Sequence, residues 1–187
     1  TAPAPQATHT PEASPTPKPD GPVIGGADRF AYLAGNEIWV SKMDGSDAAP
    51  ITQDGVAKND IGWTPDGQSL YYLSGQCVYT VPLAGGERQI LTCFNFAEKL
   101  QAFEISPDGN QAAINIDNQL HILPYDVSLL RSIAVREDLT RLAGCKDFAP
   151  YARYRSEYAH WSRDSRQIAL MIWGAAHDIG SADTVHT

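Results

Sequence analysis

The chain has 187 residues, of which 43% are hydrophobic and 19% are charged. This composition is typical of a folded domain and too apolar for a fully disordered protein. The formal net charge of -8 repels phosphate backbones, so we expect no nucleic-acid partner. No apolar run approaches the roughly 18 residues that a membrane-spanning helix needs, and the longest, residues 168–173, has the length of a strand.

The first 22 residues predict a disordered linker. Residues 1–22 carry seven prolines interleaved with Thr, Ala and Ser, and no hydrophobic residue larger than Ala. Such a segment cannot bury enough apolar area to offset its ordering entropy, and it favours extended polyproline II. Segments of this kind often follow the cleaved signal or lipid-anchor site of exported bacterial proteins. We therefore expect an extracytoplasmic protein, whether periplasmic, cell-surface or secreted. The alternative is an ordinary disordered terminus.

The chain starts at Thr1, without an initiator Met, which indicates a processed or cut terminus. A lipoprotein would be anchored through a residue that this sequence does not contain. No membrane span is expected.

From residue 23 onward, short runs of β-branched and aromatic residues alternate with Gly, Asn and Asp, the pattern of strands joined by tight turns. No amphipathic helical stretch exceeds about two turns, so the sequence predicts an all-β fold. The predicted strands are residues 30–33, 37–43, 50–52, 61–64, 69–73, 77–83, 88–92, 103–106, 111–115, 119–124, 129–135, 160–162 and 167–173.

A turn signature occurs three times. It reads WTPDG at 63–67, ISPDG at 105–109 and WSRDS at 161–165. The first two copies are 42 residues apart, and the third follows after 56 residues, which is one period plus an insertion of 14. A period near 42 fits the four-stranded blade of a β-propeller. Pro fixes φ in such a turn, Asp bonds back to the backbone and Gly adopts positive φ. Ser165 replaces this Gly, so the third turn should differ or carry strain.

The segments 63–67 and 105–109 resemble the W-S-P-D-G repeat of TolB-like (WD40-like) β-propellers. The strands that end in M-D-G at 43–45 and L-A-G at 83–85, each followed by a strand that ends in I-T or L-T, also resemble that family. The resemblance covers about residues 28–173. It implies blades of four antiparallel strands around a central channel, but no single activity, because members bind proteins, cap peptidases or sense ligands.

The repeat predicts a propeller segment at 23–187. Its blades would span about 28–56, 57–97, 98–142 and, as a partial blade, 156–187. Closed propellers have four to eight blades, and an open arc leaves end blades exposed. We therefore expect an incomplete arc of about three to four blades from a longer polypeptide. A compact four-bladed ring would need strands from the polar tail at 176–187.

The three cysteines allow three interpretations. Cys77 and Cys93 lie equally far from Gly85, so a hairpin centred on Gly85 would place them face to face, where they can form a disulfide. A two-residue turn would move them out of register. The alternatives are a Cys93–Cys145 bridge between loops of adjacent blades, and three reduced cysteines.

The insertion at 144–158 is the predicted binding site, because it is basic and aromatic in an acidic chain. Its candidate residues are Lys146, Phe148, Tyr151, Arg153, Tyr154, Arg155 and Tyr158. Tyr and Arg anchor interfaces, and inserted loops often carry function. A partner with carboxylate groups would fit. The alternative is structural: the aromatic rings pack on the blade, and the arginines pair with Asp147 and Glu157.

The sequence contains no G-x-S-x-G, H-E-x-x-H or P-loop motif, and we expect no catalytic residue, cofactor or metal. The spacing of His177, Asp178, Asp183 and His186 matches no metal site. We favour an extracytoplasmic binding or scaffolding module for a protein or small ligand. The alternative is the N-terminal propeller portion of an exported serine peptidase of the prolyl-oligopeptidase type, with its catalytic domain beyond residue 187. Carbohydrate binding has only the Tyr and Trp content in its favour.

Overall fold

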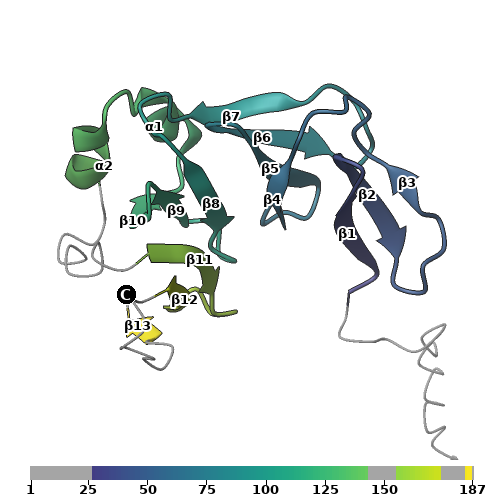
Figure 1. The fold of residues 1–187 in the computed structure, drawn as a ribbon. Helices are drawn as coiled ribbons and strands as arrows, with labels where there is room; N and C mark the ends of the chain where they lie inside the picture. Colours follow the sequence, from purple (N-terminus) through teal and green to yellow (C-terminus); the bar gives the residue numbers. More distant parts are fainter. Residues whose placement is uncertain (1–26, 143–154, 174–183, 187) are drawn as a thin grey trace, which may run out of the picture.

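The structure, a computed structural model, describes residues 27–142, 155–173 and 184–186, which form four small antiparallel sheets around an arc (Figure 1). The first sheet contains β1 (Arg29–Ala34), β2 (Glu37–Lys42) and β3 (Ala49–Pro50), and the second contains β4 (Asn59–Trp63), β5 (Ser69–Ser74), β6 (Cys77–Pro82) and β7 (Gln89–Cys93). The third contains β8 (Leu100–Ile105), β9 (Gln111–Ile116) and β10 (Gln119–Pro124), and the fourth contains β11 (Arg155–Trp161), β12 (Gln167–Trp173) and β13 (Thr184–His186).

Each sheet is a meander in which neighbours in sequence are neighbours in space. The strands β4, β8 and β11 begin their sheets on the inner side of the arc (Figure 1), and we call them the inner strands. In the first sheet β1 occupies the edge, and no described strand lies on its inner side. Two hairpins close through pairs of residues with positive φ, Gly35-Asn36 and Asp117-Asn118, which suit the twist of antiparallel strands.

The inner strands occupy equivalent places in successive sheets, as the repeat predicts. Each ends on the first residue of the turn signature, and that residue pairs with the same position of the next strand. The pairs are Trp63 with Leu70, Ile105 with Ala112, and Trp161 with Ile168. The all-β propeller arc is therefore confirmed.

The three repeated turns share one conformation. The N–H of Gly67, Gly109 and Ser165 donates to the carbonyl three residues earlier, at 2.8, 2.8 and 2.9 Å. Ser165 adopts φ of 59°, so the expected strain is present in an unchanged turn. Its hydroxyl, in compensation, accepts a hydrogen bond from the N–H of Asp108 at 3.0 Å and ties the third turn to the second.

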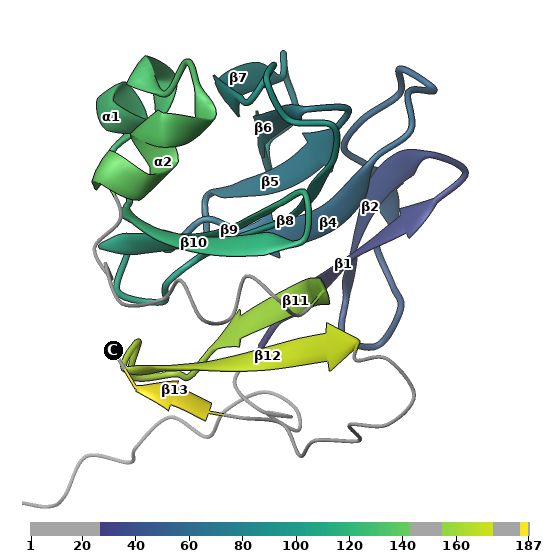
Figure 2. The same ribbon diagram turned by 60° about the vertical axis from the view of Figure 1, so that its left-hand side comes forward.

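The predicted strand at 129–135 is wrong, because residues 127–132 form a helix and residues 133–135 form no strand. The helix α1 (Val127–Ser132) is capped by Asp126, whose carboxylate accepts from the N–H of Leu129 at 2.9 Å. A second helix, α2 (Arg136–Leu142), follows. The two helices lie beside β7 and β10 (Figure 2) and bury Leu130 and Leu139. The burial of these helix faces against the sheets decides the conformation, which strand propensity alone had not predicted.

Three apolar clusters join the sheets in chain order. We call the face of a sheet that meets the preceding sheet its front face, and the opposite face its back face. The first cluster packs Ile38 and Val40, on the back face of the first sheet, against the front face of the second sheet, where Leu70, Tyr72 and Val81 are at most 1% exposed.

The other two clusters repeat this head-to-tail arrangement. The back face of the second sheet packs against the front face of the third in the second cluster, which also includes residues of α1 and α2. The buried members of this cluster are Tyr71, Leu73, Val78, Leu91, Phe94, Ala97, Leu100, Phe103, Ile105, Ala112, Ile114, Ile116, Leu123, Leu130, Ile133 and Leu139. The back face of the third sheet meets the front face of the fourth through Ala113, Leu120, Ile122, Ala159, Trp161, Ile168 and Leu170.

The disulfide between Cys77 and Cys93 is present, in the hairpin of β6 and β7. Near the turn Thr80 pairs with Gln89, one residue off the register predicted from a centre at Gly85. A bulge at Leu91 then restores that register, so Cys77 lies opposite Cys93. The predicted pairing is right, although the turn that was expected to produce it is not symmetric.

Part of the polar tail at 176–187 supplies a strand: Thr184–His186 forms β13 and pairs with β12. No helix among the described residues is long and apolar enough to cross a membrane.

Candidate functional site

The predicted binding insertion falls mainly outside the described residues. Lys146, Phe148, Tyr151, Arg153 and Tyr154 are not described. Arg155 and Tyr158 lie on β11, on the inner side of the fourth sheet, but their side chains are outside the description. The role proposed for this cluster therefore stays a prediction.

The inner strands carry a row of titratable groups that link one sheet to the next. Asp60 on β4 accepts a hydrogen bond from the N–H of Phe103 on β8 at 2.6 Å. Glu104 on β8 in turn accepts from the N–H of Trp161 on β11 at 3.4 Å, and the Trp161 indole N–H donates to the Glu104 carbonyl at 3.3 Å. His160 lies next to this contact, with Nδ1 3.6 Å from Glu104 Oε2.

Burial controls the protonation of both carboxyl groups. It raises the pKa of Asp60, although the Phe103 N–H and the nearby His160 oppose the shift. It also raises the pKa of Glu104 against the lowering effect of His160. The His160 side chain is 74% exposed and Oε2 of Glu104 has no hydrogen-bond partner among the described residues. The row thus combines two largely buried carboxyl groups, of Asp60 and Glu104, with the solvent-exposed imidazole of His160.

The side chain of Tyr71, on β5, lies against β4 beside this row. Its ring lies over Gly62, where a Cβ atom would approach the ring carbon Cζ to 2.2 Å, so this place requires glycine. Its hydroxyl oxygen accepts from the N–H of Ile105 at 3.4 Å, and burial raises the pKa of the phenol. Asp60 itself has φ of 49°, at a bulge of β4 between Asn59 and Gly62. Bulges and unusual backbone often accompany functional positions.

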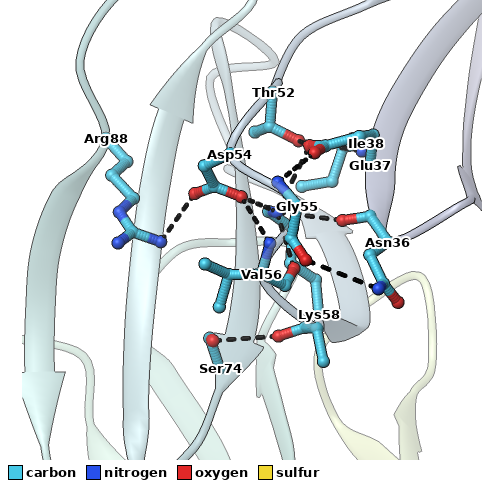
Figure 3. A network of polar contacts seen from close by, with 11 residues as sticks. Asn36, Glu37, Ile38, Thr52, Asp54, Gly55, Val56, Lys58, Ser74 and Arg88 are labelled. Atoms are coloured by element: carbon cyan, nitrogen blue, oxygen red, sulfur yellow. Dashed lines mark hydrogen bonds and ion pairs between the residues drawn. The ribbon is translucent and has the colours of Figure 1, made fainter.

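A second polar cluster surrounds the buried ammonium group of Lys58 (Figure 3). Nζ donates to the carbonyls of Asn36 at 2.9 Å and Val56 at 2.8 Å, to Glu37 Oε2 at 3.3 Å and to the carboxylate of Asp54. The side chain is fully buried, and its ion pairs and hydrogen bonds offset the cost of desolvation.

The Lys58 cluster ties three parts of the chain together. Asp54 also pairs with Arg88, which directly precedes β7 of the second sheet, at 2.8 Å, and Thr52 donates to Glu37 at 2.5 Å (Figure 3). The hydrogen bond from Thr52, with further help from Gly55 N–H and Lys58, lowers the pKa of Glu37. Burial raises the pKa of Asp54. The hydrogen bonds from Lys58 and the Val56 N–H and the charges of Lys58 and Arg88 outweigh this effect, so the pKa of Asp54 is also lowered. With every partner internal, the cluster acts as a clamp between the first and second sheets.

An open hollow of about 660 Å³ lies between the start of β1 and the first turn signature. It is lined by Ala27, Asp28, Arg29, Trp63, Gly67, Gln68, Leu83 and Ala84. Trp63 is 36% exposed there, whereas its repeat equivalent Trp161, covered by β8, is 9% exposed.

The sequence interpretation missed Asp60, Glu104, His160 and Lys58. Glu104 and His160 each directly precede the first residue of a turn signature, which was a usable signal for the inner strands. Asp60 and Lys58 have no such signal. No group of three His, Cys, Asp or Glu side chains within the described ranges could hold a metal ion.

No family model and no curated protein matches the sequence. The structure, however, is similar to TolB from Acinetobacter baumannii, with a TM-score of 0.56 and 18% identity over 85% of this chain and 41% of that one. It is also similar to a putative TolB from Agrobacterium tumefaciens, with a TM-score of 0.58 and 18% identity over 80% and 52% of the two chains. A chain of a nidogen/laminin complex gives a TM-score of 0.54 and 13% identity over 78% and 52%.

This chain thus spans about half the length of the first two matched structures or less. At these identities the likeness concerns the fold, and it agrees with the repeated turns, the inner strands and the head-to-tail sheets. The described residues therefore form a β-propeller arc whose fold is similar to that of the TolB structures.

Proposed function

We propose that the chain is an extracytoplasmic binding module rather than an enzyme, and that its ligand binds along the inner strands β4, β8 and β11. The observation that carries this proposal is the row formed by Asp60, Glu104 and His160 on consecutive inner strands, at the concave side of the arc. A scaffold that presents side chains from several rigid strands in one row suits recognition.

The chemistry of the row favours a ligand with hydrogen-bond donors, such as an amide-rich or basic segment of a protein. Oε2 of Glu104 accepts no hydrogen bond from the described residues, and it lies 3.6 Å from Nδ1 of His160, whose side chain is 74% exposed. An ammonium, guanidinium or amide N–H would pair with the Glu104 carboxyl group, whose side chain is 28% exposed, and stabilise its charged form.

The disulfide supports placement outside the cytoplasm, because such bonds persist mainly in oxidising compartments. Thiol trapping in intact cells tests this part of the proposal. Cys77 and Cys93 should resist alkylation until a reductant is added. Full labelling of both cysteines without reductant would contradict export.

Affinity capture with the immobilised chain, applied to an extract of the cell envelope, tests the binding site. Glu104→Gln and His160→Ala should each lose the captured partner, because they change the acceptor and the exposed ring of the row. Glu87→Gln, which changes an exposed carboxylate outside the row, is the control and should retain it. Capture that survives both row variants would overturn the site.

A further inference from the structure

The strand β7 forms the edge of the second sheet that lies opposite the inner strand β4, and no described strand pairs with its outer side. An edge strand presents carbonyl and N–H groups to which an extended segment of another polypeptide can add as a further strand. Ile90 favours such association, because its apolar side chain is 50% exposed on β7. The second sheet packs against a sheet on either side, so this edge does not arise from where the described chain begins or ends.

The helix α1 occupies this edge through hydrogen bonds to the backbone of β7 (Figure 2). Arg131 Nε donates to the carbonyl of Leu91 at 3.0 Å, and Arg131 Nη2 donates to the carbonyl of Ile90 at 2.7 Å. Both carbonyls lie at the bulge, where Leu91 has no residue opposite it on β6. One guanidinium thus satisfies two successive carbonyls, which suits its planar arrangement of donors.

Other contacts hold α1 in place without the help of this guanidinium. The hydroxyl of Thr92 on β7 donates to the carbonyl of Leu130 at 2.9 Å in a buried environment. The side chain of Leu130 is fully buried in the second apolar cluster, to which Ile133, directly after the helix, also belongs. We therefore expect the helix to stay on the sheet when the guanidinium alone is removed.

The third sheet shows which element α1 replaces. In the second sheet the chain continues after β6 as the edge strand β7, whereas after β10 it continues as α1, and the third sheet has three described strands. The segment with the strand pattern of a fourth strand thus forms a helix, and this helix covers the edge of the preceding sheet.

We propose that α1 is an edge cover of the second sheet, in which Arg131 prevents an extended strand of another polypeptide from pairing with β7. An incoming strand would have to displace both hydrogen bonds of the guanidinium before it could reach the backbone of Ile90 and Leu91. Covering an edge with a helix is one way in which proteins avoid association through their sheets. The proposal does not depend on a ligand at the inner strands, because β4 and β7 lie at opposite edges of the sheet.

Light scattering over a series of concentrations tests this proposal on the whole 187-residue chain. Arg131→Met keeps an unbranched apolar side chain but removes the donors. It should lower the concentration at which half of the chain is associated by roughly ten-fold or more, because two charge-assisted hydrogen bonds no longer oppose strand addition. Arg141→Met is the matched control, since Arg141 is 73% exposed on α2 and pairs with Asp138 of the same helix. This variant has the same net charge as Arg131→Met and should associate like the parent.

A second substitution separates protection of the edge from a loss of packing. Ile90→Lys places a charge on the edge that opposes strand pairing, so the double variant Arg131→Met and Ile90→Lys should associate as weakly as the parent. Arg131→Lys, which keeps the charge without the planar fork, is a milder variant in case Arg131→Met does not fold, and should give an intermediate result. Three outcomes would each overturn the proposal: association of Arg131→Met equal to that of the parent, an equal increase in Arg141→Met, or an increase that Ile90→Lys does not reverse.

Discussion

The two junctions that flank the second sheet are built from different chemistry. The junction with the first sheet contains an ammonium group, Lys58, that is buried among carboxylates and carbonyls, in addition to its apolar cluster. The junction with the third sheet has the largest apolar cluster and the two helices. A repeat of similar strands thus does not require similar contacts, because the linkers between sheets supply side chains that the repeat does not specify.

The difference should appear in how each junction responds to mutation and pH. An apolar junction depends on shape and buried area, and should respond little to charge. A junction held by ion pairs should weaken when its carboxylates are protonated. The pKa values of Glu37 and Asp54 are lowered in the fold, so their contribution is present above their unfolded pKa values and is lost as the pH falls through the folded ones.

Truncation in the apolar junction should have the largest effect. Phe103 is 1% exposed and its ring meets Tyr71 edge to face, at 5.5 Å and 80°. Phe103→Ala should lower the free energy of unfolding by about 3–5 kcal/mol, since it removes buried area and leaves a cavity. Urea unfolding measures the change. A loss below about 1 kcal/mol would show that the second and third sheets are not joined through this cluster.

Removal of the disulfide tests how much it contributes to the stability of the second sheet, which takes part in both junctions. The bond closes a loop with a sequence separation of 16 residues. The double variant Cys77→Ser and Cys93→Ser should be less stable by about 3 kcal/mol, chiefly because its unfolded chain gains entropy. Thermal unfolding of the oxidised protein, the reduced protein and the double variant gives the measurement. Equal stability of all three would refute the bridge.

Loss of the buried ammonium should have a smaller effect than either change above. Lys58→Met keeps the length of the side chain but leaves Glu37 and Asp54 without their shared cation. We expect a loss of about 2 kcal/mol, because both carboxylates keep other hydrogen-bond donors and reach solvent. Chemical denaturation at neutral pH checks the value. Lys58→Arg is a useful comparison, and a variant Lys58→Met more stable than the parent would mean that the clamp costs stability.

His121, on β10 of the third sheet, should make the free energy of unfolding depend on pH. Burial, with a further contribution from Arg136, lowers the pKa of His121 to about 4. The unfolded chain takes up this proton near pH 6.5, so stability falls as the pH drops from about 6.5 to about 4, by roughly 3 kcal/mol. His121→Gln should flatten this slope in unfolding experiments across the range.

The smallest expected effect concerns the strained third turn. Ser165→Gly relieves the positive φ but loses the hydrogen bond to Asp108, so its net effect should lie within about 0.5 kcal/mol. Ser165→Ala loses the same bond and keeps the strain, and should be less stable than Ser165→Gly by about 1 kcal/mol. The reverse order would show that backbone strain is not stored at this turn.

Local sequence was enough to place most strands, the three turns and the equivalent positions of Trp63, Ile105 and Trp161, because alternation, turn residues and a regular period act over a few residues. It also indicated the Cys77–Cys93 pair, although a bulge at Leu91 was needed to bring the two cysteines opposite each other. The helix at 127–132 was missed. Asp126 was a readable capping residue, but the burial of Leu130 against two other sheets outweighed the strand propensity of the segment.

The row on the inner strands was not predictable in this way. Asp60, Glu104 and His160 are far apart in the sequence, and their pairing follows from how neighbouring sheets align. The Lys58 clamp likewise depends on a linker folding back on a hairpin of another sheet. Such groups come together only after the sheets pack, since burial and the approach of distant strands set both their partners and their pKa values.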